Sequence, residues 1–598
     1  MTTNSPIPAR LQALRRAMRD AKLAAYVVPS SDPHLSEYLP ARWQGRERFS
    51  GFTGSVGTLV VTDNFAGLWV DSRYWSHAEK ELAGTGVQMM KIASAAATLH
   101  IDWLAENLAE GATVGVDGAV LGLATARLMT ASFSAKKIAL ETAHDLLNKV
   151  WEDRPALPAA LIFEHLPPFA AQSRKDKLTA LRITLKEKNT QWHFVSTVDD
   201  IAWLFNLRGA DVSYNPVFIA HALIGQENAW IFIDKHKVPA EIQARLAEDG
   251  IKIAPYADAA TQLAALKQTR ILLDPKRITY QFRQAIDASV DVIESINPSV
   301  LTKSRKTTSE AQFVRETMEQ DGAALCDFFS WLEHSLGKQT LTELDIDEKI
   351  NAARARRPYF VSPSFATIAG YNANGAMPHY RATKESHATI EGDGLLLIDS
   401  GGQYLGGTTD ITRMMPIGQV TADQKRDFTL VLKGMIALSK MRFPRGTFST
   451  VLDTVARAPI WAEGVNYGHG TGHGVGYFLN VHEGPQSITA YATPDAHMVM
   501  ENGMITSNEP GIYRLGKWGV RIENLLLCVP AETTEFGEFL QFETLTLCPI
   551  DTRCIEMKLM NEDEIDWLNH YHAQVLARLS PLVQGHAQGW LIERTLPI

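Results

Sequence analysis

Acidic residues and a histidine stand at the ends of apolar runs in the last third of the chain, where they could bind metal ions. The set is Asp399, Asp410, His473, Glu509 and Glu523, with His379 upstream. Hard divalent cations take carboxylate oxygens, and an imidazole nitrogen completes many such sites. Two cations that share carboxylates can hold a hydroxide between them, lower its pKa and polarise a carbonyl group. The residue types therefore predict a dinuclear metal centre, and such a centre could hydrolyse a peptide bond.

The two aspartates belong to one predicted hairpin region. An apolar strand ends at Asp399, Gly401 and Gly402 form a predicted turn, and a second strand contains Asp410. Carboxylates at the ends of paired strands can converge, so we expect Asp399 and Asp410 to lie close together.

The remaining candidates lie on a glycine-rich loop and a predicted strand. The sequence GHGTGHGVG contains His469 and His473 and has too many glycines for a stable helix, so a loop is predicted. In GVRIENLLLCV, the alternation of a strand puts Arg521 and Glu523 on one face. The positively charged Arg521 is therefore expected beside the carboxylate of the proposed ligand Glu523.

Each candidate taken singly would favour a structural role. An aspartate at a strand end is usually a turn former, a buried glutamate is usually an ion-pair partner, and His469 and His473 could be hydrogen-bonded loop residues. The combination and order of all these residues is specific, and it favours the metal site.

Composition indicates a large globular protein of several domains. A chain of 598 residues exceeds what one hydrophobic core usually supports, and we expect three domains. The net charge of -9 provides no basic footprint for nucleic acid. Four cysteines without CxxC spacing argue against a zinc finger and fit free thiols in a reducing compartment.

The N-terminal segment and the hydropathy of the chain favour a cytoplasmic location. Arginines alternate with apolar residues between Arg10 and Arg19, without the uninterrupted apolar core of a secretory signal. A mitochondrial transit segment is an alternative, but Asp20 and the strand that follows favour a first globular helix. No apolar stretch is long enough to span a bilayer, so no membrane partner is expected.

The first half of the chain contains an internal duplication. The sequence LQALR at Leu11 recurs as LTALR at Leu178, and AYVVPSSD, which ends at Asp32, corresponds to WHFVSTVD, which ends at Asp199. A paired-strand pattern that ends at Asp71 also recurs, ending at Asp234. Repeated helix, strand and hairpin units predict two similar α/β domains in tandem.

Linker composition sets the expected domain boundaries. The proline-bearing segment 151–160 separates the two copies, and polar and basic residues in segment 296–310 precede a long amphipathic helix. We therefore expect domains at residues 1–158, 159–303 and 304–598. The expected fold class is α/β (α+β), with the metal site in the third domain.

The motifs in their order resemble a known family. They are MPHY at His379, DSGG at Asp399, TTDITR at Asp410, HGTGHGVG, VHEGP at His482, NEPGIY at Glu509 and GVRIEN at Glu523. Together they resemble the pita-bread metallopeptidases, and within these the three-domain, cytosolic-type aminopeptidase P, or Xaa-Pro aminopeptidase, family. The resemblance extends to SSDPHLSEY, RFSGFTGSVGT and DDIAWLFNLRG in the first half.

This resemblance implies a pita-bread catalytic domain that removes the first residue from peptides with proline in second position. Asp399, Asp410 and Glu523 would contact one or both metal ions, Asp410 and Glu523 would bridge them, and His473 and Glu509 would complete one ion's shell. Because oxygen donors dominate, Mn²⁺ is the expected metal, with Co²⁺, Fe²⁺ or Zn²⁺ as alternatives.

The resemblance also implies roles beside the ligands. His379, His469 and His482 would line the substrate site, and Arg521 would support the ligand carboxylates. Each histidine could instead be a structural loop residue. Glu509 is the expected general base, although a purely ligating role is an alternative.

Three other functions share this scaffold. A prolidase has the same ligands but typically lacks the duplicated first half. A creatinase-like amidinohydrolase uses no metal, and a non-enzymatic peptide-binding relative would have lost ligands; the complete ligand set argues against both. The family also implies a homodimer formed by the catalytic domain, for which the amphipathic segment 564–583 is a candidate interface.

Overall fold

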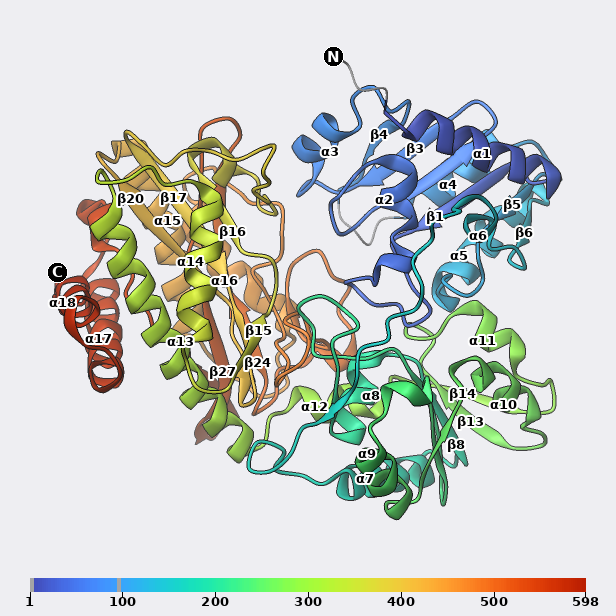
Figure 1. Cartoon of the computed structure of the whole chain (residues 1–598). Helices are drawn as coiled ribbons and strands as arrows, with labels where there is room; N and C mark the ends of the chain where they lie inside the picture. Colours follow the sequence, from blue (N-terminus) through green and yellow to red (C-terminus); the bar gives the residue numbers. More distant parts are fainter. Residues whose placement is uncertain (1–4, 94–97) are drawn as a thin grey trace. The chain divides into compact units, whose positions relative to one another are not determined.

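The chain forms two compact units in a computed structural model that describes residues 5–93 and 98–598. The first unit extends to Leu166 and resumes at Gln172–Ser299, and the second comprises Pro167–Ala171 and Val300–Ile598. Both mix helices with strands, which confirms the expected fold class (Figure 1). Residues 1–4 and 94–97 of the expected first domain lie outside the described residues.

The first unit contains two six-stranded sheets of the same design. Their strand orders are β4-β3-β2-β1-β5-β6 and β12-β11-β10-β8-β13-β14. In each, a central strand pairs antiparallel with one neighbour and parallel with the other. The central strands β1 and β8 are the two segments that the sequence duplication aligned, so the tandem α/β arrangement is confirmed.

The bounds of these strands are as follows: β1 Ala25–Pro29, β2 Thr58–Thr62, β3 Ala66–Val70, β4 Gln88–Lys91, β5 Thr113–Gly115, β6 Ala139–Glu141, β8 Trp192–Val195, β10 His221–Gly225, β11 Ala229–Phe232, β12 Ile251–Ala254, β13 Arg270–Leu273 and β14 Asp291–Glu294. A short pair, β7 (Phe163–Glu164) and β9 (Leu207–Arg208), also belongs to this unit.

Helices cover these sheets, and the two that begin the repeats carry the duplicated LxALR sequence. The arginine-bearing N-terminal segment forms α1, as expected, and it buries Leu11, Leu14 and Met18 at the spacing of one helix face. The helices are α1 Ile7–Asp20, α2 Gly45–Ser50, α3 Trp75–Glu81, α4 Leu99–Asn107, α5 Leu123–Phe133, α6 Leu146–Val150, α7 Arg174–Glu187, α8 Val198–Phe205, α9 Ala240–Glu248, α10 Ala259–Ala265 and α11 Tyr280–Ala285.

The second unit is built on antiparallel strands flanked by long helices (Figure 1). Helix α12 (Pro298–Ser304) leads into it, and the expected long helix is α13 (Thr308–Ser335). A capping box starts α13, because the Thr307 hydroxyl accepts from the Glu310 amide and the Glu310 carboxylate accepts from the Thr307 amide. The other helices are α14 Glu343–Ala355, α15 Ala422–Ser439, α16 Ser449–Trp461, α17 Glu562–Leu579 and α18 Gly585–Arg594.

The strands of the second unit form three small sheets and two two-stranded pairs. The strands are β15 Phe360–Pro363, β16 Ile368–Tyr371, β17 Gly394–Ser400, β18 Gly402–Tyr404, β19 Gly407–Thr408, β20 Ile411–Ile417, β21 Arg442–Pro444, β22 Gly472–His473, β23 Ser487–Ile488, β24 Ile505–Asn508, β25 Gly511–Arg514, β26 Trp518–Arg521, β27 Asn524–Thr534 and β28 Gly537–Thr544. Val520 and Ile522 belong to the main core of this unit, on the face opposite Arg521 and Glu523.

One local prediction was wrong. The glycines after Asp399 do not form a simple turn, because Gly402 begins β18, which pairs with β19 before the chain enters β20. A Cβ on Gly401 would lie 2.0 Å from the carbonyl oxygen of Thr409. Glycine is therefore needed for a close backbone approach, and Asp410 lies just before β20 rather than within it.

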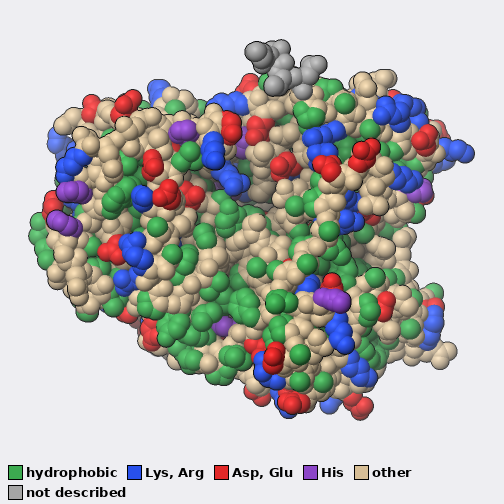
Figure 2. All heavy atoms as spheres, viewed as in Figure 1, with side chains coloured by type: hydrophobic (Ala, Val, Ile, Leu, Met, Phe, Trp, Pro, Cys, Tyr) green, Lys and Arg blue, Asp and Glu red, His purple; other side chains and the backbone are tan. Residues whose placement is uncertain are grey.

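Two surface properties complete the description. Acidic and basic side chains are interspersed on the face seen in Figure 2. Among the described residues, no helix combines the length and the apolar character needed to cross a membrane.

Candidate metal centre

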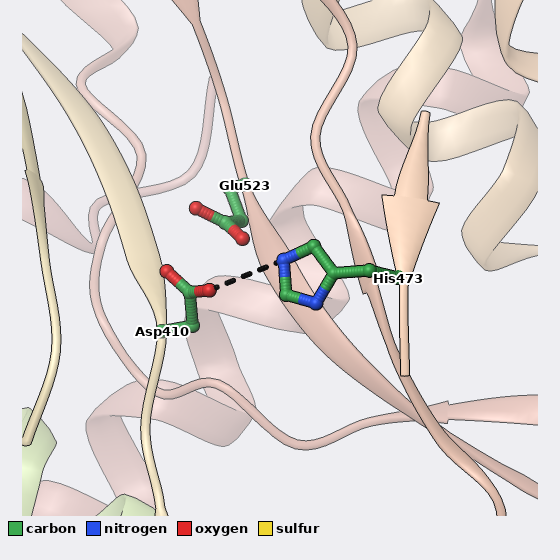
Figure 3. Close-up of side chains that lie close together, drawn as sticks. All are labelled: Asp410, His473 and Glu523. Carbon is green, nitrogen blue, oxygen red and sulfur yellow. Dashed lines mark ion pairs between the residues drawn. The ribbon is translucent and has the colours of Figure 1, made fainter. Parts of the chain in front are cut away.

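Asp410, His473 and Glu523 converge in the second unit. One ligand atom from each lies within 4.8 Å of the others, and His473 Nε2 is 3.5 Å from Asp410 Oδ2. Figure 3 shows the two carboxylates and the imidazole ring turned toward one another. They come from the residue before β20, from β22 and from the link between β26 and β27, so the centre forms only when distant segments fold together.

His473 lies in the two-residue strand β22, whereas the sequence predicted a loop throughout. β22 pairs with β23, and a Cβ on Gly472 would lie 1.9 Å from the carbonyl oxygen of Ser507 in β24. Glycine at this position therefore lets the histidine segment lie against β24, the strand that leads to Glu509.

Asp399 interacts electrostatically with this cluster of residues. Its Oδ2 accepts from Arg521 Nη2 at 2.5 Å. Burial raises the pKa of Asp399, and although Arg521 opposes the shift, Asp410 and Glu509 add to it, so the pKa reaches about 7. Ionising a carboxyl group that is surrounded by other carboxylates costs free energy, and a bound metal ion would offset this cost.

Glu509 also lies close to His473. Its Oε1 is 3.5 Å from His473 Nε2 and accepts from Ser507 Oγ at 3.2 Å. Burial, with Asp410, raises its pKa against the opposing effects of His473 and Arg521. The side chains of His473 and Glu509 are 20% and 19% exposed, against 6% for Asp410, so the centre is open on the side of His473 and Glu509.

The donor set fits cations. Asp399 Oδ1 and Glu523 Oε1 are buried and accept no hydrogen bond from the described residues. Burial raises the pKa of Glu523 well above its usual value, with Asp410 as the next cause. Buried oxygens without donors are expensive, and metal coordination satisfies them. Asp410, His473 and Glu523 therefore form one cluster of donor atoms, with Glu509 3.5 Å from His473 and with Asp399 interacting electrostatically with Asp410 and Glu509.

Arg521 joins several parts of the site. It bonds Asp399, donates from Nε to Thr412 Oγ1 at 3.2 Å, and reaches the carbonyl oxygen of Pro378 at 3.4 Å from Nη2. Thr412 in turn donates to Glu523 Oε2 at 2.9 Å. The arginine therefore stands where the sequence interpretation expected a cation that supports ligand carboxylates.

His379, His469 and His482, which were expected to line the substrate site, lie in different surroundings. The rings of His473 and His482 meet edge to face with centroids 4.3 Å apart. His469 Nε2 is 2.8 Å from the Tyr513 hydroxyl. His379 lies in the segment after Pro378, the residue whose carbonyl Arg521 contacts.

Sequence reasoning missed Tyr513 and Arg413. The Tyr513 hydroxyl accepts from Arg521 Nη1 at 2.7 Å and so connects His469 to Arg521. Arg413 is buried and donates from Nη1 to the backbone carbonyl of Glu523 at 2.7 Å. Both residues belong to motifs described above, NEPGIY and TTDITR. Each is a side chain with a polar end in a strand with apolar neighbours, and this pattern could have indicated a role in the site.

Comparison with known proteins defines the class first. The protein-family model for metallopeptidase family M24 matches residues 312–530, and the family model for its C-terminal region matches residues 538–598. Two creatinase/prolidase N-terminal domain models match residues 10–150 and 153–310. Fold and site thus define a metallopeptidase of family M24 with two creatinase-like N-terminal domains.

Similarity along the whole chain then narrows the class. "Aminopeptidase P2" of Arabidopsis thaliana is 36% identical, covering 100% of this chain and 89% of the relative. "Xaa-Pro aminopeptidase 1" of Dictyostelium discoideum is 36% identical, covering 97% and 94%. A solved Caenorhabditis elegans structure, described as a cytosolic X-prolyl aminopeptidase with a di-nuclear active site, matches with a TM-score of 0.93 and 31% identity, covering 99% of this chain and 100% of that one. The chain belongs to the aminopeptidase P family.

Proposed function

We propose that this chain is a metal-dependent exopeptidase that removes the N-terminal residue from peptides with proline in second position. The observation that carries the proposal is the convergence of Asp410, His473 and Glu523, with Asp399 and Glu509 beside them, in a chain similar over its whole length to proteins named for that activity. The proposed specificity for proline is supported by the names of the similar proteins.

The proposed ligand roles are those that the family resemblance implies, and the clustering of Asp410, His473 and Glu523 supports them. Asp399, Asp410, His473, Glu509 and Glu523 would hold two divalent cations, with Asp410 and Glu523 shared between them. Bound there, the cations would supply Lewis acidity toward the scissile carbonyl and lower the pKa of a nucleophilic water. Because four of the five donors are carboxylates, Mn²⁺ is the proposed metal, with Co²⁺, Fe²⁺ or Zn²⁺ as alternatives.

The chain's own residues supply proton transfer and orientation. Glu509, on the open side of the centre, would accept the proton of the attacking water. His379, His469 and His482 would contact the substrate's carbonyl group and return the proton to the leaving nitrogen. Arg521 would hold the Asp399 carboxylate through their 2.5 Å contact.

The finer properties are also proposals. The domains would span residues 1–158, 159–303 and 304–598, near the boundaries of the matched family models. The location would be cytoplasmic, as the description of the C. elegans enzyme supports. A homodimer would form through the catalytic domain. The expected amphipathic segment near its end is α17, which buries Leu568, Tyr571 and Val575 and leaves its other face available.

Peptide cleavage tests this function. Metal-stripped protein would be incubated with an Xaa-Pro-Yaa tripeptide, an Xaa-Pro dipeptide and an Xaa-Ala-Yaa control, before and after addition of Mn²⁺, and the products identified by mass spectrometry. We expect metal-dependent release of the first residue from the proline tripeptide, with the alanine peptide left intact. Cleavage of the dipeptide alone would instead identify a prolidase, and no cleavage with Mn²⁺ or with Co²⁺, Fe²⁺ or Zn²⁺ added in its place would indicate a binding protein.

A further inference from the structure

A buried ion pair on α16 lies behind the histidine segment of the site. Asp453 and Arg457, one helical turn apart, pair at 2.6 Å between Oδ2 and Nε, and their side chains are 0% and 1% exposed. A buried pair of this kind is a weak source of stability, because desolvation of two charges offsets their attraction. Its hydrogen bonds to other segments therefore indicate what it does.

Arg457 binds the first half of the segment 466–473, which we term the histidine segment. Nη1 donates to Asn466 Oδ1 at 2.9 Å and to the Tyr467 carbonyl at 2.8 Å, and Nη2 donates to the His469 carbonyl at 2.5 Å. The guanidinium also lies 3.8 Å from the centroid of the Tyr467 ring. One guanidinium group thus donates to three acceptors within four residues of this segment.

Asp453 binds the second half of the same segment. Its Oδ1 accepts from the Thr471 amide at 3.2 Å and from the Thr471 hydroxyl at 2.6 Å. The Thr471 carbonyl accepts from the Glu509 amide at 2.7 Å. The ion pair is therefore connected by hydrogen bonds both to the backbone of His469 and to the backbone of Glu509.

The His469 ring is sensitive to the position of its backbone. Nδ1 lies 2.8 Å from the Gly470 carbonyl, so it donates there and leaves Nε2 directed to Tyr513. A shift of the His469 carbonyl would move the ring relative to Tyr513 and to the centre. We propose that Asp453 and Arg457 are positioning residues, which hold His469 and Glu509 in register for catalysis; this role rests on the function proposed above.

The first test is the variant Arg457→Lys. Lysine keeps the charge that pairs with Asp453 but cannot bond three acceptors at once. We expect kcat to fall about 10- to 100-fold, the range seen when groups that orient active-site residues are lost, with KM changed less than about threefold and metal content unchanged. The matched control is Arg354→Lys, which alters another buried arginine of the same unit that pairs with Asp321. It should lower thermal stability comparably and leave kcat near the wild-type value. Equal losses of kcat in both variants would overturn the proposal.

A double-mutant cycle asks whether Arg457 acts through His469. In a His469→Ala background, Arg457→Lys should lower kcat less than about threefold further, because the group it orients is gone. In a His482→Ala background, the full effect of Arg457→Lys should remain. An undiminished effect in the His469→Ala background would contradict a positioning role.

Hydrogen exchange separates this proposal from the proposed function. In Arg457→Lys, the amides of residues 466–473 and of Glu509 should exchange at least about tenfold faster than in the wild type and in Arg354→Lys. Unchanged exchange rates would overturn the positioning role even if the enzyme is active. A wild-type protein that fails to cleave Xaa-Pro peptides would refute the proposed function whatever the exchange rates.

Discussion

Replacing Glu523 with glutamine is expected to remove a shared metal ligand and to lower kcat/KM by about 10³-fold or more. Metal assistance contributes several kcal/mol to such reactions, and each 1.4 kcal/mol is about a factor of ten. Glutamine preserves the shape of Glu523 and can still accept from Thr412 Oγ1, so the fold should be retained. Steady-state kinetics and metal analysis of the purified variant measure both effects.

Although its activity should fall, the metal-free Glu523→Gln variant should be at least as stable as the metal-free wild type. Burial and Asp410 raise the pKa of Glu523, so the folded, metal-free chain binds this proton more tightly than the unfolded chain does. That contribution is present below the unfolded pKa and is lost as pH rises through the folded pKa. At neutral pH, chelated Glu523→Gln should therefore melt at or above the temperature of the chelated wild type.

A structural role for Glu523 would give a different pattern. If the carboxylate served mainly as an ion-pair partner, glutamine would lower the melting temperature of the chelated protein and leave metal content unchanged. Wild-type metal content together with wild-type kcat/KM would contradict the assignment of Glu523 as a ligand. The control is Glu501→Gln, since Glu501 pairs with Arg445 away from the centre.

The second large effect is expected from Glu509→Gln. Loss of a general base typically costs about 10²- to 10⁴-fold in rate, and kcat should fall within this range while the fold stays intact. Ser507 Oγ can still donate to the amide oxygen that replaces Glu509 Oε1. Single-turnover cleavage of an Xaa-Pro-Yaa peptide measures the chemical step directly.

Metal content separates the two roles considered for Glu509. A large loss of rate with both ions retained would identify it as the proton acceptor, because glutamine can ligate but cannot take up a proton. The same loss with one ion missing would identify an essential ligand. Turnover near the wild-type rate would refute the proton-acceptor role, because glutamine can replace glutamate as a ligand but not as a base.

The sequence predicted those features of the site that depend on local pattern. Alternation identified the face that Arg521 and Glu523 share, and the apolar run before Asp399 identified β17. The connection between Asp399 and Asp410 was mispredicted, since β18 pairs with the distant strand β15 as well as with its sequence neighbour β19, and the pairing with β15 cannot be read from the local sequence.

Asp453 and Arg457 illustrate what pattern cannot provide. An aspartate and an arginine four residues apart on a helix usually form an exposed pair of small energetic effect. Only the packing of α16 against the histidine segment buries this pair and directs its remaining hydrogen-bonding atoms to Tyr467, His469 and Thr471. Tyr513 was missed for the same reason, because its two partners come from separate segments.

The duplication in the first unit was predictable because it is a repeat. Matching segments such as those ending at Asp32 and Asp199 must form similar elements, whichever elements these are. The order of strands within each sheet depends on long-range pairing and required the structure.

The most direct test of the account is a count of metal ions against activity. Metal-free protein would be titrated with Mn²⁺, the number of ions bound per chain followed by native mass spectrometry, and the release of the first residue from an Xaa-Pro-Yaa peptide measured at each step. We predict that activity appears as ions bind and is complete at two ions per chain. Full activity in the metal-free protein, or two bound ions without cleavage, would contradict it.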